Sequence, residues 1–558
     1  MKRKNILISL FALALLFLTA TLFLREKEAP QNEIRSSVIA EIKSLDPVMA
    51  NDTYSNRASS QIHEALYGYD HLKRPVELIP LLAEGMPEFT ANGLTATIKI
   101  KKGIYFHDNE AFENGQGREL TAEDFVYSFK RLANPKIGSQ GYWIFEGKIK
   151  GLNEWRAKLA SNESQESDPV EGLQALDSHT LQIQLTQPYH QLAQVLAMTL
   201  TAPVPREVVE KYGLDFGNKP VGVGPFQFQS WTRGHKLVLT RHPRYFEKGL
   251  PKVDQVSIFE ITEDQPRWLS LLNGDLDFSG IPKDNYDTSV VNGELIEDLQ
   301  KQGFRLDVYD SSDVVYTAFN MEDPLLGKNK NLRRAIAHAF NNQLVIEKFY
   351  NYRAREAQSL IAPGLDGYDE SYKNPYQTYD VEKAKKFLAD AGYPNGQGLP
   401  PLTFSISNSD WDRQFSELFA QKMKEIGITI KIETSSWPQF SEKVKNRKAQ
   451  IFSMAWTADY PDSQNLLQLL YSKNASPGPN GANFKNVEYD RLYEQALLLP
   501  RGPERTALYL KMRDIAVEEA PWIFHTHRRI FTIYHDRIKN MKMPQFHHNF
   551  LKHLEKEL

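Results

Sequence analysis

Hydrophobic and polar residues alternate in two short runs in the first half of the chain, at 94–100 and 180–185. A period of two places successive side chains on opposite faces, so each run predicts a half-buried strand. Between them, the sequence TAED at 121–124 has the spacing of a capping box and precedes an apolar stripe that includes Phe125 and Phe129. We therefore expect an amphipathic helix that begins after residue 121.

In the second half of the chain, helical and strand-like patterns follow one another. Asp380 is placed to cap a helix that ends at Gly392, and a strand is expected at 428–434. The helix before that strand stops at Gly427, and its apolar stripe consists of Phe415, Leu418, Phe419, Met423 and Ile426. This alternation indicates an α/β protein with a largely parallel sheet covered on both faces, which would bind ligands at its strand ends.

The N-terminal residues have the charge and hydropathy order of an export signal. Three basic residues at 2–4 precede an uncharged run at 6–24, and charged residues follow at 25–28. As a helix, the run would span about 28 Å, which is close to the thickness of the bilayer core. No Ala-x-Ala cleavage site is present, so an uncleaved membrane anchor is an alternative to a cleaved signal. Either way, we expect the rest of the chain to be exported.

Length and composition limit the remaining classes. A chain of 558 residues exceeds one ordinary core, so two or three lobes are expected. The net charge is -3 and no basic block is present, which disfavours nucleic acid as a partner. Without a single cysteine, the chain has no disulfide, no thiolate chemistry and no lipid-modified cysteine. A periplasm, with the protein either free or tethered through residues 6–24, is the expected location.

Few residues suggest metal binding or catalysis. His525 and His527 would share one face of a strand, and histidines also occur at 547, 548 and 553. Histidines without a paired carboxylate or cysteine pattern are weak evidence for a metal site, so we predict no metal and no cofactor. No serine–histidine elbow, HExxH, P-loop or GxGxxG sequence is present. We therefore predict that the protein is not an enzyme.

Several longer motifs, in a fixed order, match one known family. They include SLDP at 44–47, IHEALYGYD at 62–70, ELTAEDFVYSFKRLANP at 119–135, GVGPFQFQSW at 222–231 and WTADYPD at 456–462. With these motifs the chain resembles the extracytoplasmic peptide-binding proteins of ABC importers, family 5. The long insert around 68–200 makes it most similar to the oligopeptide-binding type.

The resemblance implies a two-lobed periplasmic-binding-protein clamp of type II with an extra third domain. Lobe I would be built from 34–67, 202–275 and 523–558, and lobe II from 276–522. The peripheral domain would span 68–201, and residues 1–30 would be the signal or anchor. Ligand would close the cleft between the lobes about a hinge.

The resemblance also implies ligand-binding residues. Asp459 stands where relatives receive the ammonium group of a bound peptide; the alternative is a turn residue before Pro461. Trp456 and Trp437 fall on positions that line ligand pockets, although core packing would also suit them. Other positions implied at the ligand are Gly222, Val223 and Gly224, whose backbone would pair with the peptide, and Tyr142 and Trp143 near the cleft. The glycines would equally suit a tight bend.

One departure from the family concerns the other end of the peptide. Relatives meet the peptide's carboxylate with basic side chains, whereas the aligned positions here hold Ser453, Asp412 and Ala337. None of these residues is basic, so the preferred length of the peptide does not follow from the resemblance.

Together these features predict a peptide-binding subunit that works with an inner-membrane ABC permease and its ATPases, as a monomer. It would capture extended peptides by their free N-terminal amine. Two alternatives remain: the same fold with another cargo, such as a nickel chelate, haem or a cell-wall peptide, or a membrane-tethered sensor without transport.

Overall fold

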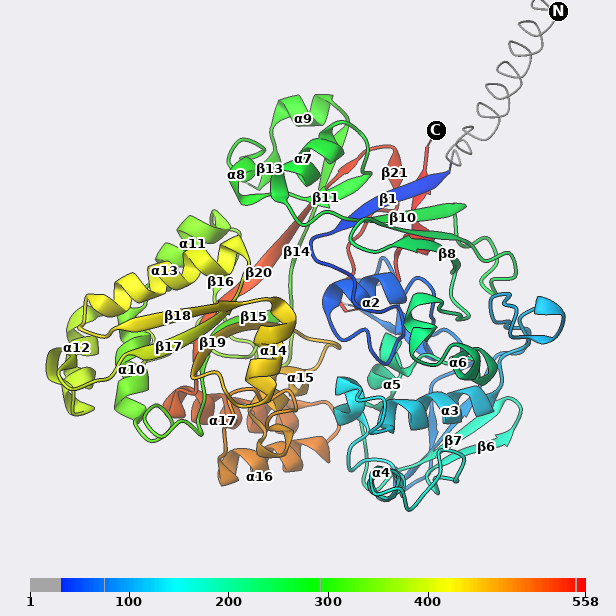
Figure 1. Cartoon of the computed structure of the whole chain (residues 1–558), viewed down its shortest axis with the longest axis horizontal. Helices are drawn as coiled ribbons and strands as arrows, with labels where there is room; N and C mark the ends of the chain where they lie inside the picture. Colours follow the sequence, from blue (N-terminus) through cyan, green and yellow to red (C-terminus); the bar gives the residue numbers. More distant parts are fainter. Residues whose placement is uncertain (1–31, 75, 292, 547–548, 558) are drawn as a thin grey trace, which may run out of the picture.

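The computed structural model describes residues 32–557 except 75, 292 and 547–548. Two lobes face each other across the centre of the molecule, and a third domain lies beside the first lobe (Figure 1). The run at 6–24, the candidate signal or anchor, lies outside the described residues. Within the described part of the chain, no helix has both the length and the apolar character needed to cross a membrane.

Lobe I is built on a four-stranded sheet with the order β1-β10-β9-β8. Its strands are β1 (Glu33–Val38), β8 (Phe226–Thr232), β9 (Lys236–Arg241) and β10 (Gln255–Glu260). Only β1 and β10 are parallel; the other pairs are antiparallel. Helix α2 (Thr53–Ser59) contributes Ala58 to the core of this lobe, and the helix lies on the side of lobe I that is nearest lobe II in Figure 1.

Lobe II contains a mixed sheet rather than the largely parallel one expected. Strand β17 (Leu402–Ser407) is parallel to β18 (Ile430–Ser435) and to β19 (Ile451–Thr457). However, β15 (Asp313–Phe319) runs antiparallel to both β19 and β20 (Trp522–His535). The predicted parallel pairing is confirmed for β17, β18 and β19, which helices connect along the chain. It was wrong at β15 and β20, because strands far apart in the chain can pair in either direction.

Strand β20 belongs to both halves of the molecule. Its first part pairs with β15 and β16 (Ala354–Glu356) of lobe II. Its second part pairs with β14 (Phe304–Asp310) and β11 (Phe278–Gly280). Residues 523–528, which the sequence-based division gives to lobe I, pair with strands of the lobe II sheet. Strand β20 and β14 are long connections at the centre of Figure 1.

The local predictions of helices and caps are confirmed. Helix α3 (Ala122–Ala133) begins with the Thr121–Asp124 capping box. Asp380 caps α12 (Val381–Asp390) by accepting a hydrogen bond from the Lys383 backbone N–H. Helix α13 (Asp410–Lys424) buries Phe415, Phe419 and Met423. The two alternating runs form β5 (Thr95–Lys99) and β7 (Thr180–Gln184), which pair in the sheet β4-β5-β7-β6 of the third domain.

The remaining elements cover these sheets and connect them. In lobe I and the third domain they include β2 (Tyr67–Tyr69), α4 (Leu152–Ala160), β6 (Leu173–Asp177), α6 (Arg206–Tyr212), α7 (Asp264–Leu272) and α9 (Glu297–Lys301). In lobe II they include α10 (Lys330–Ala339), α11 (Asn342–Tyr350), α14 (Trp437–Lys445), α15 (Gln464–Leu467), α16 (Val487–Leu497) and α17 (Pro503–Glu519).

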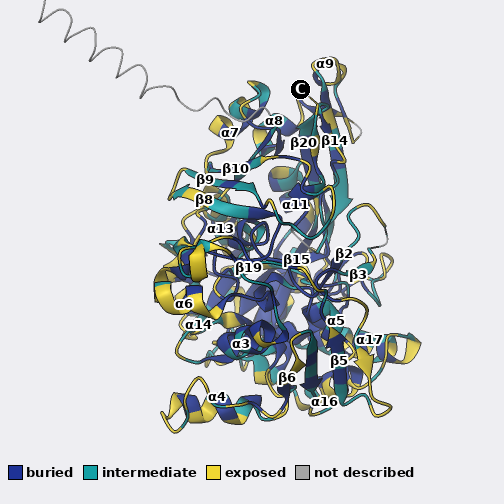
Figure 2. Cartoon of the chain, turned by 90° about the vertical axis from the view of Figure 1, so that its right-hand side faces the viewer, coloured by how far each residue is buried: buried dark blue, intermediate teal, exposed yellow. Residues whose placement is uncertain are grey.

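The third domain is joined to lobe I by a buried ion pair as well as by apolar contacts. Arg131 of α3 donates from both terminal nitrogens to Asp46 of the SLDP motif, at 2.7 and 2.5 Å. Each of the two side chains is 7% exposed. The side view in Figure 2 shows α3 largely buried and α6 exposed beside it. A motif shared with a binding-protein family therefore has a structural role here.

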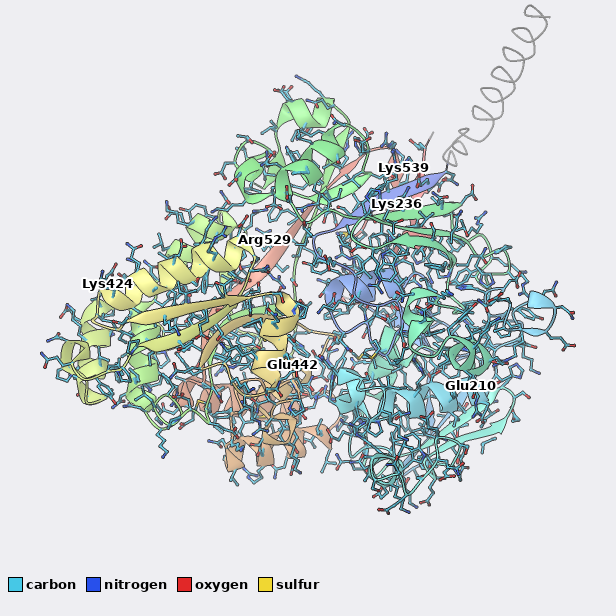
Figure 3. All side chains as sticks on the ribbon, in the orientation of Figure 1. Glu210, Lys236, Lys424, Glu442, Arg529 and Lys539 are labelled. Atoms are coloured by element: carbon cyan, nitrogen blue, oxygen red, sulfur yellow. The ribbon has the colours of Figure 1, made fainter. Side chains whose placement is uncertain are left out.

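We expect Asp46→Ala to destabilise the protein strongly, because it leaves the Arg131 guanidinium buried without a counter-charge. The loss in free energy of unfolding should be about 3–5 kcal/mol. The matched control is Glu210→Ala, which breaks the exposed Arg206–Glu210 pair on the surface of α6 (Figure 3) and should cost less than about 1 kcal/mol. Thermal unfolding of both variants checks this; equal midpoints would contradict it.

Candidate functional site

Asp459 lies two residues beyond the end of β19, and Asn465 of α15 holds it in place. The Asn465 side-chain Nδ2 donates to Asp459 Oδ2 at 3.1 Å, and the Asp459 backbone N–H donates to Asn465 Oδ1 at 3.1 Å. The same Oδ1 accepts a hydrogen bond from Trp456 Nε1 at 3.0 Å. One fully buried amide therefore orients both predicted site residues of this loop.

The Asp459 carboxylate has no cation beside it in the described part of the chain. None of the ion pairs found there involves Asp459, and its one side-chain partner is the neutral amide of Asn465. The side chain is partly buried. Burial raises the pKa of Asp459 to about 6, and the hydrogen bond from Asn465 acts in the opposite direction. Burial therefore disfavours the ionised form of this carboxylate.

Asp462, three residues further along, is the opposite case. It forms an ion pair with Arg505 at 3.0 Å and accepts a hydrogen bond from the Tyr509 hydroxyl at 2.8 Å. It also accepts one from Gln191 of the third domain at 3.1 Å, which links that domain to lobe II. Asp462 is thus a structural residue. The loop contains one compensated and one uncompensated carboxylate, and only the second has capacity for a ligand.

Tyr69 of β2 is a further residue of this site that the sequence did not indicate. Its hydroxyl is buried and forms no hydrogen bond with any described residue. Burial raises the pKa of Tyr69, and the charges of Asp459 and Asp462 raise it further. Neither Tyr69 nor Asn465 carried a signal of its own, and Asn465 gains its role only through its hydrogen bonds with Asp459 and Trp456.

The two predicted tryptophans lie in different surroundings. Trp456 is half-buried against the core of lobe II. Trp437 begins α14 and is 41% exposed, with the Lys43 ammonium 5.5 Å from its ring centre. Trp437 and Lys43 line a hollow of about 590 Å³ between lobe I, the third domain and α14. Asp459 and Trp456 are not among the residues that line this hollow, so the tryptophans do not form one wall.

The structure gives the segment at 222–224 a packing role. Gly222, Val223 and Gly224 are buried. A Cβ on either glycine would lie within 2.5 Å of the Ile62 carbonyl oxygen. The Gly224 N–H donates to that oxygen at 2.8 Å, and the Gly222 carbonyl accepts from the His107 N–H at 2.9 Å. These contacts fit the alternative of a tight bend, and the pairing of this segment with a peptide stays a prediction.

The aromatic pair of the third domain also serves its own core. Tyr142 is 6% exposed, its hydroxyl donates to Asn153 Oδ1 at 2.6 Å, and the Arg156 guanidinium lies 4.3 Å from its ring. Trp143 is partly buried against the same core. These contacts give Tyr142 a structural role in the third domain, and a role of Tyr142 and Trp143 at the ligand stays a prediction.

The histidines at the end of the chain have protein partners. Burial lowers the pKa of His525 to about 3, and its ring nitrogens contact Thr317 Oγ1 and Asn342 Oδ1. His527 contacts the Asp313 carbonyl. No group of three or more metal-ligating side chains occurs among the described residues. Residues 547–548 lie outside them, and the ring of His553 stacks on His71.

We expect Asp459→Asn to stabilise the empty protein at pH 7 but not at pH 4. The folded-state pKa of about 6 lies above the ordinary value of 3.8, so the native state binds more protons between these values. Stability is then lost as the pH rises from about 4 to about 6, by about 1–3 kcal/mol.

Urea unfolding at pH 4 and pH 7 measures this difference. The matched variant Asp462→Asn should be destabilising at pH 7, because it removes the closer of the two carboxylates that pair with the buried Arg505. An equal effect of Asp459→Asn at both pH values would contradict the assignment of a raised pKa.

Gly224→Ala should destabilise the protein by about 1–3 kcal/mol, because the new Cβ would overlap the backbone of residue 62. Gly85→Ala is the matched control, since a Cβ at Gly85 meets no atom within 4 Å. Comparison of their unfolding midpoints tests the packing role. A Gly224→Ala variant that folds normally and loses only ligand binding would restore the role at the ligand.

Comparisons with known proteins agree with this architecture. Residues 77–478 match the family model of the bacterial extracellular solute-binding proteins, family 5. A glutathione-binding protein GsiB from Salmonella choleraesuis is 27% identical over 487 residues, which is 86% of each chain. These matches cover most of both proteins.

Two solved structures share the fold. The periplasmic binding protein DppA from Helicobacter pylori, in complex with the peptide STSA, aligns with a TM-score of 0.81 and 23% identity, covering 94% of this chain and 98% of that one. The murein tripeptide binding protein MppA from Escherichia coli aligns with a TM-score of 0.80 and 21% identity, covering 95% and 99%. The chain therefore belongs to the bacterial extracellular solute-binding proteins of family 5, with the two-lobed fold of that family.

Proposed function

We propose that this protein is the periplasmic peptide-binding subunit of an ABC importer, and that it captures extended peptides by their free amine. In this role it delivers its ligand to an inner-membrane permease and its ATPases. The observation that carries the proposal is the partly buried Asp459 carboxylate, oriented by Asn465 and without a cation in the described part of the chain. The family and the peptide ligand named for one structural neighbour support it.

The chemistry of Asp459 suits an ammonium group. A carboxylate that loses water on burial and gains no counter-charge is costly. An arriving ammonium offsets that cost through charge-assisted hydrogen bonds. The Tyr69 hydroxyl, also buried without a partner among the described residues, offers a further oxygen acceptor to the same group. A ligand without a free amine would leave both groups unmatched, so the site discriminates against it.

The surroundings of Asp459 suit the N-terminal amine that all free peptides share, and not one particular side chain of the ligand. Trp456, held by Asn465, presents a rigid aromatic edge next to the amine site. Glutathione, which gives the GsiB relatives their name, has a free amine and falls within the proposed class. A nickel or haem cargo has less support, because the described residues contain no cluster of metal ligands. A membrane tether would lie at residues 6–24, outside the described part.

We expect purified protein to bind a randomised pool of di- to pentapeptides, and not the same pool after N-acetylation. Asp459→Asn should weaken binding of the free-amine pool by about 100-fold, since one partner of a desolvated charge pair is removed. Native mass spectrometry and isothermal titration measure both. Asp410→Asn, at an exposed aspartate of α13, is the control. No binding of any free-amine peptide would refute the proposal.

Binding should also weaken at low pH. The empty protein has an Asp459 pKa of about 6, and the ammonium requires the ionised carboxylate. Affinity should therefore fall by up to about tenfold per pH unit as the pH drops from 6 to 4. The Asp459→Asn variant should lack this dependence, and a wild-type affinity that is constant over this range would count against the assignment.

A further inference from the structure

The loop that carries Asp459 is anchored to a different part of the molecule on each side of that residue. On one side, the Ala458 backbone N–H donates to the Ser312 carbonyl of lobe II at 2.8 Å. On the other side, the fully buried ring of Tyr460 lies in the apolar core that lobe I and the third domain share. The Tyr460 hydroxyl donates back to Gln464 Oε1 of α15 at 2.5 Å. Asp459 therefore lies where lobe II meets the third domain.

Two polar contacts accompany this apolar one. Gln191, which precedes α5 (Leu192–Val195), is fully buried, and its Nε2 donates to Asp462 Oδ2 at 3.1 Å. His190 Nε2 contacts the carbonyl oxygen of Leu498, the residue after α16, at 3.2 Å. Helix α15 lies on the side of lobe II that faces the third domain (Figure 1). The contact thus involves both flanks of the Asp459 loop.

The third domain is held to lobe I more firmly than to lobe II. Arg131 and Asp46 form a buried ion pair with two hydrogen bonds across the first boundary, and one apolar core continues through it. Across the second boundary, the described residues form two hydrogen bonds and no ion pair, and a single buried ring of lobe II enters the core. When the lobes separate about their hinge, we therefore expect the third domain to stay with lobe I and Tyr460 to leave its core.

We propose that Tyr460 and Gln191 are positioning residues of the amine site: they dock the Asp459 loop on the third domain and thereby couple capture of the ligand's amine to that docking. This inference rests on the proposed peptide function. Docking encloses the carboxylate, and a carboxylate removed from water interacts more strongly with an arriving ammonium. A ligand that binds the docked form must raise the population of that form, and docking must raise the affinity by the same factor.

The first test is the affinity for the free-amine pool of di- to pentapeptides, measured by isothermal titration. Gln191→Ala should weaken binding by about 5- to 10-fold, at the low end of coupling between sites. Asp462 keeps its bonds to Arg505 and Tyr509 in this variant, so the protein should fold. The matched control is Ser128→Ala, at a buried residue whose hydrogen bonds lie on the lobe I side. It should bind as the wild type does.

Two variants of Tyr460 separate the ring from its hydroxyl. Tyr460→Leu removes both the ring and the hydrogen bond to Gln464, and it should weaken binding of the free-amine pool by about 5- to 10-fold. Tyr460→Phe loses the same hydrogen bond but keeps the ring in the core, so it should weaken binding less. Isothermal titration of the two variants measures this difference.

The second test measures docking itself. The chain has no cysteine, so a short bis-maleimide cross-linker reacts only with thiols that are introduced. His190→Cys combined with Leu498→Cys places one exposed thiol on each side of the contact. Adding Gln191→Ala should slow cross-linking by about 5- to 10-fold, and saturating free-amine peptide should restore it by at least that factor. The N-acetylated pool should have no effect, and neither pool would change a purely structural contact.

The outcomes separate this inference from the proposed function. Cross-linking of the Gln191→Ala protein that saturating free-amine peptide leaves unchanged would overturn the coupling and leave the amine site intact. Wild-type affinity in both Gln191→Ala and Tyr460→Leu would also overturn it. Absence of binding by every free-amine peptide would refute the peptide function and this inference with it.

Discussion

The balance of charge around the loop after β19 governs what this protein can bind. Asp459 and Asp462 are three residues apart, yet Arg505 compensates only the second. The protein thus stabilises the loop with one carboxylate and leaves the other with an amide partner alone. An uncompensated charge in a partly buried position lowers stability, and such a position is typical of a site completed by a ligand. Asn465 makes this arrangement specific, because it sets the orientation of both Asp459 and Trp456.

The two-lobed architecture explains why this charge matters. Contacts between the halves already exist, since Gln191 of the third domain reaches Asp462 and Lys43 of lobe I lies over Trp437. Long strands connect the halves, with β20 shared between the sheet of lobe II and the strands next to lobe I. In such a clamp, a ligand stabilises the closed form by contacts that only that form completes.

Several motifs of the family contribute to the packing of the fold. Asp46 of the SLDP motif neutralises Arg131 between lobe I and the third domain. The glycines of GVGPF permit a close approach to the backbone of residue 62, and Tyr142 packs in the third-domain core. A motif shared across a family therefore indicates the fold before it indicates the site. The same residue types, glycine and tyrosine, suit a buried bend or core as well as they suit a ligand.

The sequence by itself determined the α/β class, the family, the capping of α3 and α12, and Asp459 as the residue to examine. These features depend on local spacing and on motif order, both of which are visible in one dimension. The tertiary structure decided the mixed direction of the lobe II sheet and the division of β20 between two halves. It also decided that Asp459 has an amide partner and no cation beside it in the described part of the chain. Pairing and burial depend on which distant segments meet, and no local pattern of residues encodes that meeting.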